Sequence, residues 1–93
     1  MDKIHIGIDV SKATLDVAIS NQKEIKSFSN DEKGINQIIN YLKREKPVLI
    51  VMESTGGLEK LLAASLAEYS LPVVVVNPRQ VRDFAKAKGR LAK

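Results

Sequence analysis

The sequence predicts an α/β fold in which a mixed five-stranded sheet of strand order 3-2-1-4-5 carries three helices. Three observations lead to this prediction. The N-terminal third holds three runs of alternating apolar residues, and the short connections between them make neighbouring strands antiparallel. The apolar period then becomes helical, and continuous apolar runs of strand length follow the helices. Right-handed crossovers place the fourth strand beside the first.

The first three strands are predicted at residues 3–10, 14–20 and 23–29. Successive side chains of a strand point to opposite faces of the sheet. In the first strand, one face carries Ile4, Ile6 and Ile8, and the other carries His5, Gly7 and Asp9. We therefore expect one apolar face, with a single carboxylate at the far end of the opposite face.

A helix is predicted between Asn30 and Pro47. Asn30 is a favourable N-cap residue, and two acids follow it in the first turn. The helix has one apolar stripe, formed by Ile35, Ile38, Ile39 and Leu42. Proline cannot continue a helix, so Pro47 marks its end.

Two parallel strands and two further helices complete the prediction. Residues 48–52 and 72–76 are continuous apolar runs, as expected of strands covered on both faces. The turn 54–57 leads into the second helix, and Asn77 and Pro78 are typical of the N-cap and first position of a third helix. This arrangement of strands and helices is that of a ribonuclease-H-like fold.

Composition narrows the class of protein. The 93 residues form one domain or part of one. The absence of cysteine excludes disulfides and thiolate metal sites, and it fits a reducing cytosol. No apolar run approaches the roughly 18 residues that span a bilayer, and the N-terminus lacks the apolar core of a signal peptide. We therefore expect no membrane association.

Two carboxylates are the candidate catalytic and metal-binding residues. Asp9 ends the predicted first strand, and Glu53 ends the fourth. Because these strands are predicted to be parallel neighbours about 4.8 Å apart, the two side chains should lie at the same edge of the sheet. Hard cations such as Mg²⁺ prefer oxygen ligands of this kind and support phosphodiester chemistry. The alternative is that Asp9 begins a turn and Glu53 caps the 54–57 turn.

The positive charge is concentrated at the C-terminus. The chain has a net charge of +4, and its last fifteen residues hold six Lys or Arg and one acid. Helical spacing there forms a basic stripe of Arg79, Arg82, Lys86 and Arg90. Such a stripe can follow a row of phosphates, and Lys12 can reach a phosphate beside Asp9. A solvated helix face is the alternative interpretation.

Three motifs resemble a known family. They are "GIDVSK" at residues 7–12, "MESTGG" at 52–57 and "VVNPRQVRDFAKAKGRLAK" at 75–93. Together they resemble the N-terminal RuvC-like domain of the DEDD transposases of bacterial insertion sequences. The resemblance runs through essentially the whole chain, and it implies a bacterial cytoplasmic recombinase that acts on DNA phosphodiester bonds with Mg²⁺.

The resemblance also implies how the site is built. Asp9 matches the first acid of a four-carboxylate Mg²⁺ site and Glu53 the second, whereas the third and fourth are expected beyond Lys93. Residues 1–93 would then be a partial catalytic domain that lacks a serine-bearing C-terminal domain. We expect this chain alone to be inactive and to bind Mg²⁺ weakly. The family further implies a structured guide RNA and a homo-oligomer.

Two other functions remain open from the residues. The first is half of an actin-like or sugar-kinase-like ATPase, which shares the opening topology but places glycine two residues after the first acid; this chain has Ser11 there. The second is a nucleic-acid-binding or self-associating module without catalysis. Steep salt dependence of binding with no Mg²⁺ effect would favour this second function.

Overall fold

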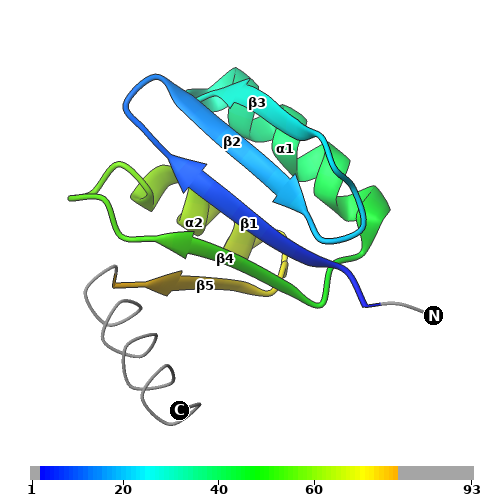
Figure 1. The fold of residues 1–93 in the computed structure, drawn as a ribbon. Coiled ribbons are helices and arrows are strands. Elements are labelled where there is room, and N and C mark those ends of the chain that lie inside the picture. The colour runs from blue at the N-terminus through cyan, green and yellow to red at the C-terminus, as the bar shows by residue number, and fades with distance from the viewer. Residues whose placement is uncertain (1–2, 78–93) are drawn as a thin grey trace, which may run out of the picture.

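The computed structural model describes residues 3–77, which form a two-layer α/β domain. One layer is a five-stranded sheet, and the other consists of two helices behind it (Figure 1). In chain order the elements are β1 (His5–Val10), β2 (Thr14–Ile19), β3 (Ile25–Ser29), α1 (Glu32–Glu45), β4 (Leu49–Glu53), α2 (Lys60–Glu68) and β5 (Val73–Val76).

The sheet has the order β3-β2-β1-β4-β5, which confirms the predicted topology. β2 pairs antiparallel with both β1 and β3, whereas β4 pairs parallel with both β1 and β5. The short turns between the first three strands impose the antiparallel pairs, and the helical crossovers impose the parallel ones. The first and fourth strands are therefore neighbours that end at the same edge.

The core lies between the sheet and the helices. Each of β1 and β2 alternates exposed and buried residues, so each contributes one apolar face. Burying a large aliphatic side chain stabilises the fold by about 1.5–3 kcal/mol. The buried set comprises Ile6, Ile8, Val10, Leu15, Val17 and Ile19 from the hairpin, Ile50 and Met52 from β4, and Ile35, Ile38, Ile39, Tyr41, Leu42, Leu62 and Leu66 from the helices.

The prediction that the parallel strands are covered on both faces is wrong for the described residues. Ile50 and Met52 of β4 are buried, but Leu49 and Val51, which alternate with them, are only half-buried. In β5, Val74 and Val75 are 44% and 41% exposed. The cause is topological, since both crossovers run in the same direction along the sheet and right-handedness puts both helices on one face.

The N-cap of α1 is Asp31, so the predicted cap at Asn30 is wrong by one residue. The Asp31 carboxylate accepts hydrogen bonds from the Gly34 backbone N–H at 2.8 Å and from the Ser29 hydroxyl at 2.7 Å. These two bonds, led by that from Gly34, hold the pKa of Asp31 below its usual value. An aspartate can form both bonds because its carboxylate has free acceptor sites for each donor.

Gly34 explains how closely α1 approaches the sheet. A Cβ atom at Gly34 would lie 1.8 Å from the backbone oxygen of Ser29, at the end of β3. Only glycine permits this contact, which sets the first turn of α1 against the strand before it. At its other end, α1 closes with Lys46 in the left-handed conformation, directly before Pro47 as predicted.

The predicted third helix lies outside the described residues, which contain two helices. Neither of these two helices is long and apolar enough to cross a membrane.

Candidate active site

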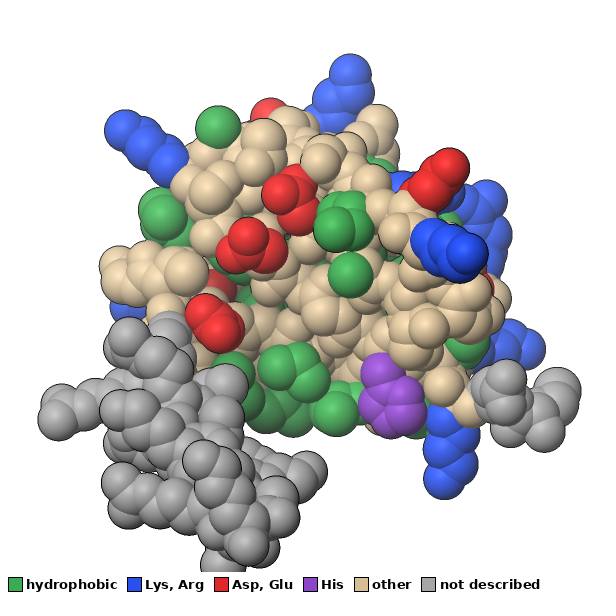
Figure 2. All heavy atoms as spheres, in the orientation of Figure 1, with side chains coloured by type: hydrophobic (Ala, Val, Ile, Leu, Met, Phe, Trp, Pro, Cys, Tyr) green, Lys and Arg blue, Asp and Glu red, His purple; other side chains and the backbone are tan. Residues whose placement is uncertain are grey.

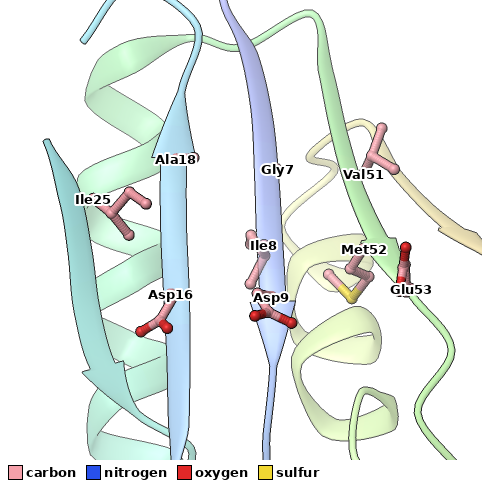
Figure 3. A pocket seen from close by; sticks show the side chains of 9 residues that line it. All are labelled: Gly7, Ile8, Asp9, Asp16, Ala18, Ile25, Val51, Met52 and Glu53. Atoms are coloured by element: carbon pink, nitrogen blue, oxygen red, sulfur yellow. The ribbon is translucent and has the colours of Figure 1, made fainter. Parts of the chain in front are cut away.

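Asp9 and Glu53 occupy equivalent positions on neighbouring parallel strands. β1 and β4 pair in a register that ends with Ile8 opposite Met52, so Asp9 and Glu53 are the next residues along the two strands. Both are exposed, and both line one hollow of about 420 Å³ on the sheet face that is not covered by α1 or α2, the two helices within residues 3–77 (Figure 3). The structure therefore brings the two predicted acids to one edge and one face of the sheet.

Small and apolar residues of three neighbouring strands line the middle of the hollow. Gly7 pairs with Ala18 on one side and Val51 on the other, and all three line the hollow. A Cβ atom at Gly7 would meet no atom within 4 Å, so the space above the strand is open. The two carboxylates thus line the same hollow as these small and apolar residues (Figure 3).

Asp16 is a third acid at this hollow, and sequence reasoning missed it. It lies on β2 directly opposite Asp9, and the Ser27 hydroxyl donates a 2.6 Å hydrogen bond to its carboxylate. The alternating pattern of residues 14–19 places Asp16 on the polar face, but only the strand register shows that it faces Asp9. Figure 2 shows acidic side chains gathered on this face, with Lys and Arg toward its margins.

The carboxylates of Asp9 and Glu53 have no hydrogen-bond or ion-pair partner within residues 3–77. Acids on adjacent strands repel each other unless a cation or a proton intervenes. Oxygen ligands of this kind suit Mg²⁺. Within the described part of the chain, no group of three or more His, Asp or Glu side chains could hold a metal ion, so these residues alone do not form a three-residue metal site.

The turn after β1 is closed by Ser11 and not by Asp9. The Ser11 hydroxyl lies 3.0 Å from the Thr14 carbonyl oxygen and accepts a 3.1 Å hydrogen bond from the Thr14 N–H. Asp9 belongs to β1 and forms no bond in this turn. Its carboxylate is therefore not needed to make the turn, in contrast to the alternative interpretation of the sequence.

The loop after β4 is organised by Glu59, a residue that sequence reasoning also missed. Glu59 is only 6% exposed, and its carboxylate accepts bonds from the Thr55 N–H at 2.9 Å, the Thr55 hydroxyl at 3.2 Å and the Gly57 N–H at 3.1 Å. Backbone donors, the Thr55 N–H first, lower the pKa of Glu59 despite the opposing effect of burial. Glu53 is thus not the residue that caps this loop.

The hydrogen bonds of Glu59 also occupy the donors with which the loop around Gly56 and Gly57 could bind a phosphate. Gly56 and Gly57 have positive φ angles of 70° and 106°, as in loops that cradle phosphate. Here, however, the N–H groups of Thr55 and Gly57 already point to the Glu59 carboxylate. An incoming phosphate would have to displace this internal anion.

Of the predicted nucleic-acid contacts, only Lys12 lies within the described residues. It is exposed in the turn that follows β1, three residues after Asp9. Its contact with phosphate stays a prediction. Arg79, Arg82, Lys86 and Arg90 lie outside the described residues.

Solved structures similar to this chain have the RuvC fold, which is ribonuclease-H-like. Thermus thermophilus RuvC in complex with a Holliday junction substrate superimposes with a TM-score of 0.62 at 13% identity, covering 88% of this chain and 69% of that one. A second Thermus thermophilus RuvC structure gives a TM-score of 0.55 at 16% identity, over 85% and 64% of the two chains. At these identities the likeness shows the fold alone, and it confirms the predicted fold class.

Two curated proteins are similar to this chain in sequence. The pilin gene-inverting proteins of Moraxella lacunata and Moraxella bovis are each 26% identical over 95 aligned residues, which cover 96% of this chain. The chain spans 30% of the length of these relatives. The DEDD_Tnp_IS110 family model, described as "Transposase", matches residues 6–93. Because this match covers nearly the whole chain, the protein belongs to the DEDD transposase family.

Proposed function

We propose that this chain is part of the catalytic domain of a DNA transposase, which cleaves or joins DNA phosphodiester bonds. In this domain, Asp9 and Glu53 would hold the divalent cation that the reaction requires. The observation that carries this proposal is the placement of the two acids at equivalent positions of adjacent parallel strands. Both are exposed and have no partner within residues 3–77. A fold gains no stability from two such acids side by side, so a ligand is the simplest reason for them.

The donor set fits a hard divalent cation. Asp9 and Glu53 would each direct carboxylate oxygens to it, while Asp16 adds negative potential from the neighbouring strand. When bound, such a cation activates water or a hydroxyl group and stabilises the leaving oxygen of a phosphodiester. Two carboxylates do not complete a site for two cations, so we expect further ligands from outside residues 3–77.

DNA is the proposed substrate because of what the relatives act on. The two Moraxella proteins are named for gene inversion, and one RuvC structure contains a Holliday junction. In this chain the open space above Gly7 leaves room for a DNA strand to approach the two acids. Lys12 and the basic residues Arg79, Arg82, Lys86 and Arg90 would neutralise phosphates of the bound DNA.

We propose that the complete enzyme is longer than this chain, because the chain spans 30% of the length of its curated relatives. The 93-residue chain by itself is then expected to bind Mg²⁺ weakly and to cleave no DNA. A guide RNA and a multimeric assembly, which the family resemblance implies, belong to the complete enzyme.

The test is Mg²⁺-dependent DNA cleavage by the complete transposase that contains this chain. We expect Asp9→Asn and Glu53→Gln each to lower the rate by about a hundredfold or more, because a metal ion supplies several kcal/mol of transition-state stabilisation. Glu24→Gln, at an exposed acid that does not line the hollow, is the matched control and should retain the wild-type rate. Full activity in either site variant would refute the proposal.

A further inference from the structure

Asn30 connects the two loops that follow the two acids. It lies between β3 and α1 and is half-buried. Its backbone N–H donates to the Ala13 carbonyl at 3.0 Å, in the turn after β1. Its side-chain Nδ2 lies 2.8 Å from the Ser11 carbonyl in the same turn and 3.5 Å from the Leu58 carbonyl, in the loop before α2.

The side chain at position 30 must donate two hydrogen bonds to bridge the two carbonyl oxygens, and an amide group can do so. The Nδ2 group has two protons, so it can donate to both carbonyls at once. Both acceptors are carbonyl oxygens, so the nitrogen and not the oxygen of the amide must face them. Aspartate at position 30 would place a second acceptor there, and alanine would leave the gap between the two loops unbridged.

The two contacted carbonyls are connected to the acids through short backbone segments and hydrogen bonds. Ser11 is two residues beyond Asp9, at the end of β1. Leu58 precedes Glu59, whose carboxylate holds Thr55 two residues after Glu53. A continuous path of hydrogen bonds and short backbone segments therefore runs from one acid to the other through Asn30.

Helix capping does not account for Asn30. The N-cap bond of α1 comes from Asp31, which accepts from Gly34. The Asn30 side chain instead points to two loops that belong to different strands of the sheet. These two contacts, at 2.8 Å and 3.5 Å, connect the loop after β1 to the loop after β4.

We propose that Asn30 is a positioning residue that holds these two loops together and so sets the separation of the Asp9 and Glu53 carboxylates. This inference rests on the proposed function, because the separation matters only if both carboxylates grip one cation. Outer partners that orient metal ligands commonly change affinity by 10–100-fold when removed. Asn30 acts through the backbone, so we expect an effect near the lower limit, about tenfold.

The experiment titrates the 93-residue chain with Mn²⁺, a paramagnetic substitute for Mg²⁺, and follows backbone amide resonances by NMR. In the wild type, amides beside Asp9 and beside Glu53 should broaden together at one Mn²⁺ concentration. Asn30→Asp and Asn30→Ala should raise that Mn²⁺ concentration about tenfold. In these variants the amides beside Asp9 and those beside Glu53 should broaden at different Mn²⁺ concentrations. The chemical-shift dispersion of the spectrum shows whether each variant is folded. Asn36→Asp, at an exposed position of α1, is the control for the added charge and should match the wild type.

The outcomes separate the two proposals. If Mn²⁺ broadens neither acid in the wild type, the metal site of the proposed function fails. If the wild type responds but folded Asn30 variants titrate like it, the positioning role fails while the metal site stands. Loss of the folded state in both variants also overturns the positioning role, because Asn30 would then serve folding alone. The positioning role of Asn30 is supported if, in a folded variant, the amides beside the two acids broaden at different and higher Mn²⁺ concentrations than in the wild type.

Discussion

The two faces of the sheet differ in composition and in exposure to solvent. On the covered face, every inward residue of β1 and β2 is aliphatic and buried against the helices. On the open face, the same strands present Gly7, Asp9, Asp16 and Ala18 to a hollow open to solvent (Figure 3). The alternation of a strand allows this division, because adjacent residues serve different faces.

The difference shows where stability and function are separated. The covered face supplies the apolar burial that pays for chain ordering. The open face holds acids on adjacent strands, and like charges directly opposite each other oppose pairing. Such a local conflict is expected at functional sites, where the rest of the fold compensates for it. Four predictions sharpen or break this comparison.

The largest contrast is expected from one substitution made on each face. Ile50→Ala removes a fully buried side chain of β4 and should lower the free energy of unfolding by about 2–5 kcal/mol. Ile25→Ala, on the open face of β3, removes a side chain that is 64% exposed and should cost less than about 0.5 kcal/mol. Urea unfolding measures both. Equal losses would show that the open face is covered in solution.

Two glycines provide the second contrast. Gly34→Ala should lower the free energy of unfolding by about 2–3 kcal/mol, because its Cβ would collide with the Ser29 backbone oxygen. Gly7→Ala meets no atom, so its stability should be unchanged or up to about 1 kcal/mol higher, as expected for alanine in a strand. Thermal unfolding followed by circular dichroism compares them. A stable Gly34→Ala variant would contradict the close approach of α1.

The third prediction concerns the acids in the absence of metal. Asp9→Asn should raise the free energy of unfolding by about 0.5 kcal/mol at low salt, because it removes repulsion with Asp16 opposite. The gain should diminish at high salt, where exposed charges are screened. In addition, millimolar Mg²⁺ should stabilise the wild type more than the variant. Calorimetry with Glu24→Gln as control measures this; a destabilised Asp9→Asn would mean that the acid supports the fold.

The smallest effect is expected from pH. The pKa values of Asp31 and Glu59 are lowered in the folded chain below their ordinary values of 3.8 and 4.5. Their stabilisation is therefore complete above about pH 5 and is lost as the pH falls through the lowered values. Glu59→Gln should flatten the loss of stability between pH 5 and 3, while Glu24→Gln should not. Parallel acid profiles for wild type and Glu59→Gln would contradict the assigned hydrogen bonds.

Local patterns predicted most of the fold. Alternation located β1 and β2, helical spacing located α1, and Pro47 marked its end. The errors arose where two adjacent residues competed for one role or where coverage depended on distant elements. Asn30 and Asp31 are both good caps, and only the contact with Gly34 distinguishes them. Apolar runs indicate strands but do not report how many helices cover them.

The candidate site was predictable only in part. Asp9 and Glu53 could be paired because they end strands that topology makes neighbours. Asp16 and Glu59 could not, since the first depends on strand register and the second on the path of a loop with two positive-φ glycines. The sequence predicts Asn30 as the N-cap of α1, but the structure assigns that position to Asp31. Its role as a bridge depends on two carbonyls that lie 19 and 28 residues away in sequence.

By itself, the sequence determined which segments form strands and helices, the order of the strands and the two acids at the ends of β1 and β4. These follow from periodicity, connection length and the handedness of crossovers, which act locally or by topology. Only the tertiary structure decided which face stays open, which acid faces Asp9 and what Asn30 bridges. Those outcomes depend on side chains that meet across the sheet, and no local pattern encodes such meetings.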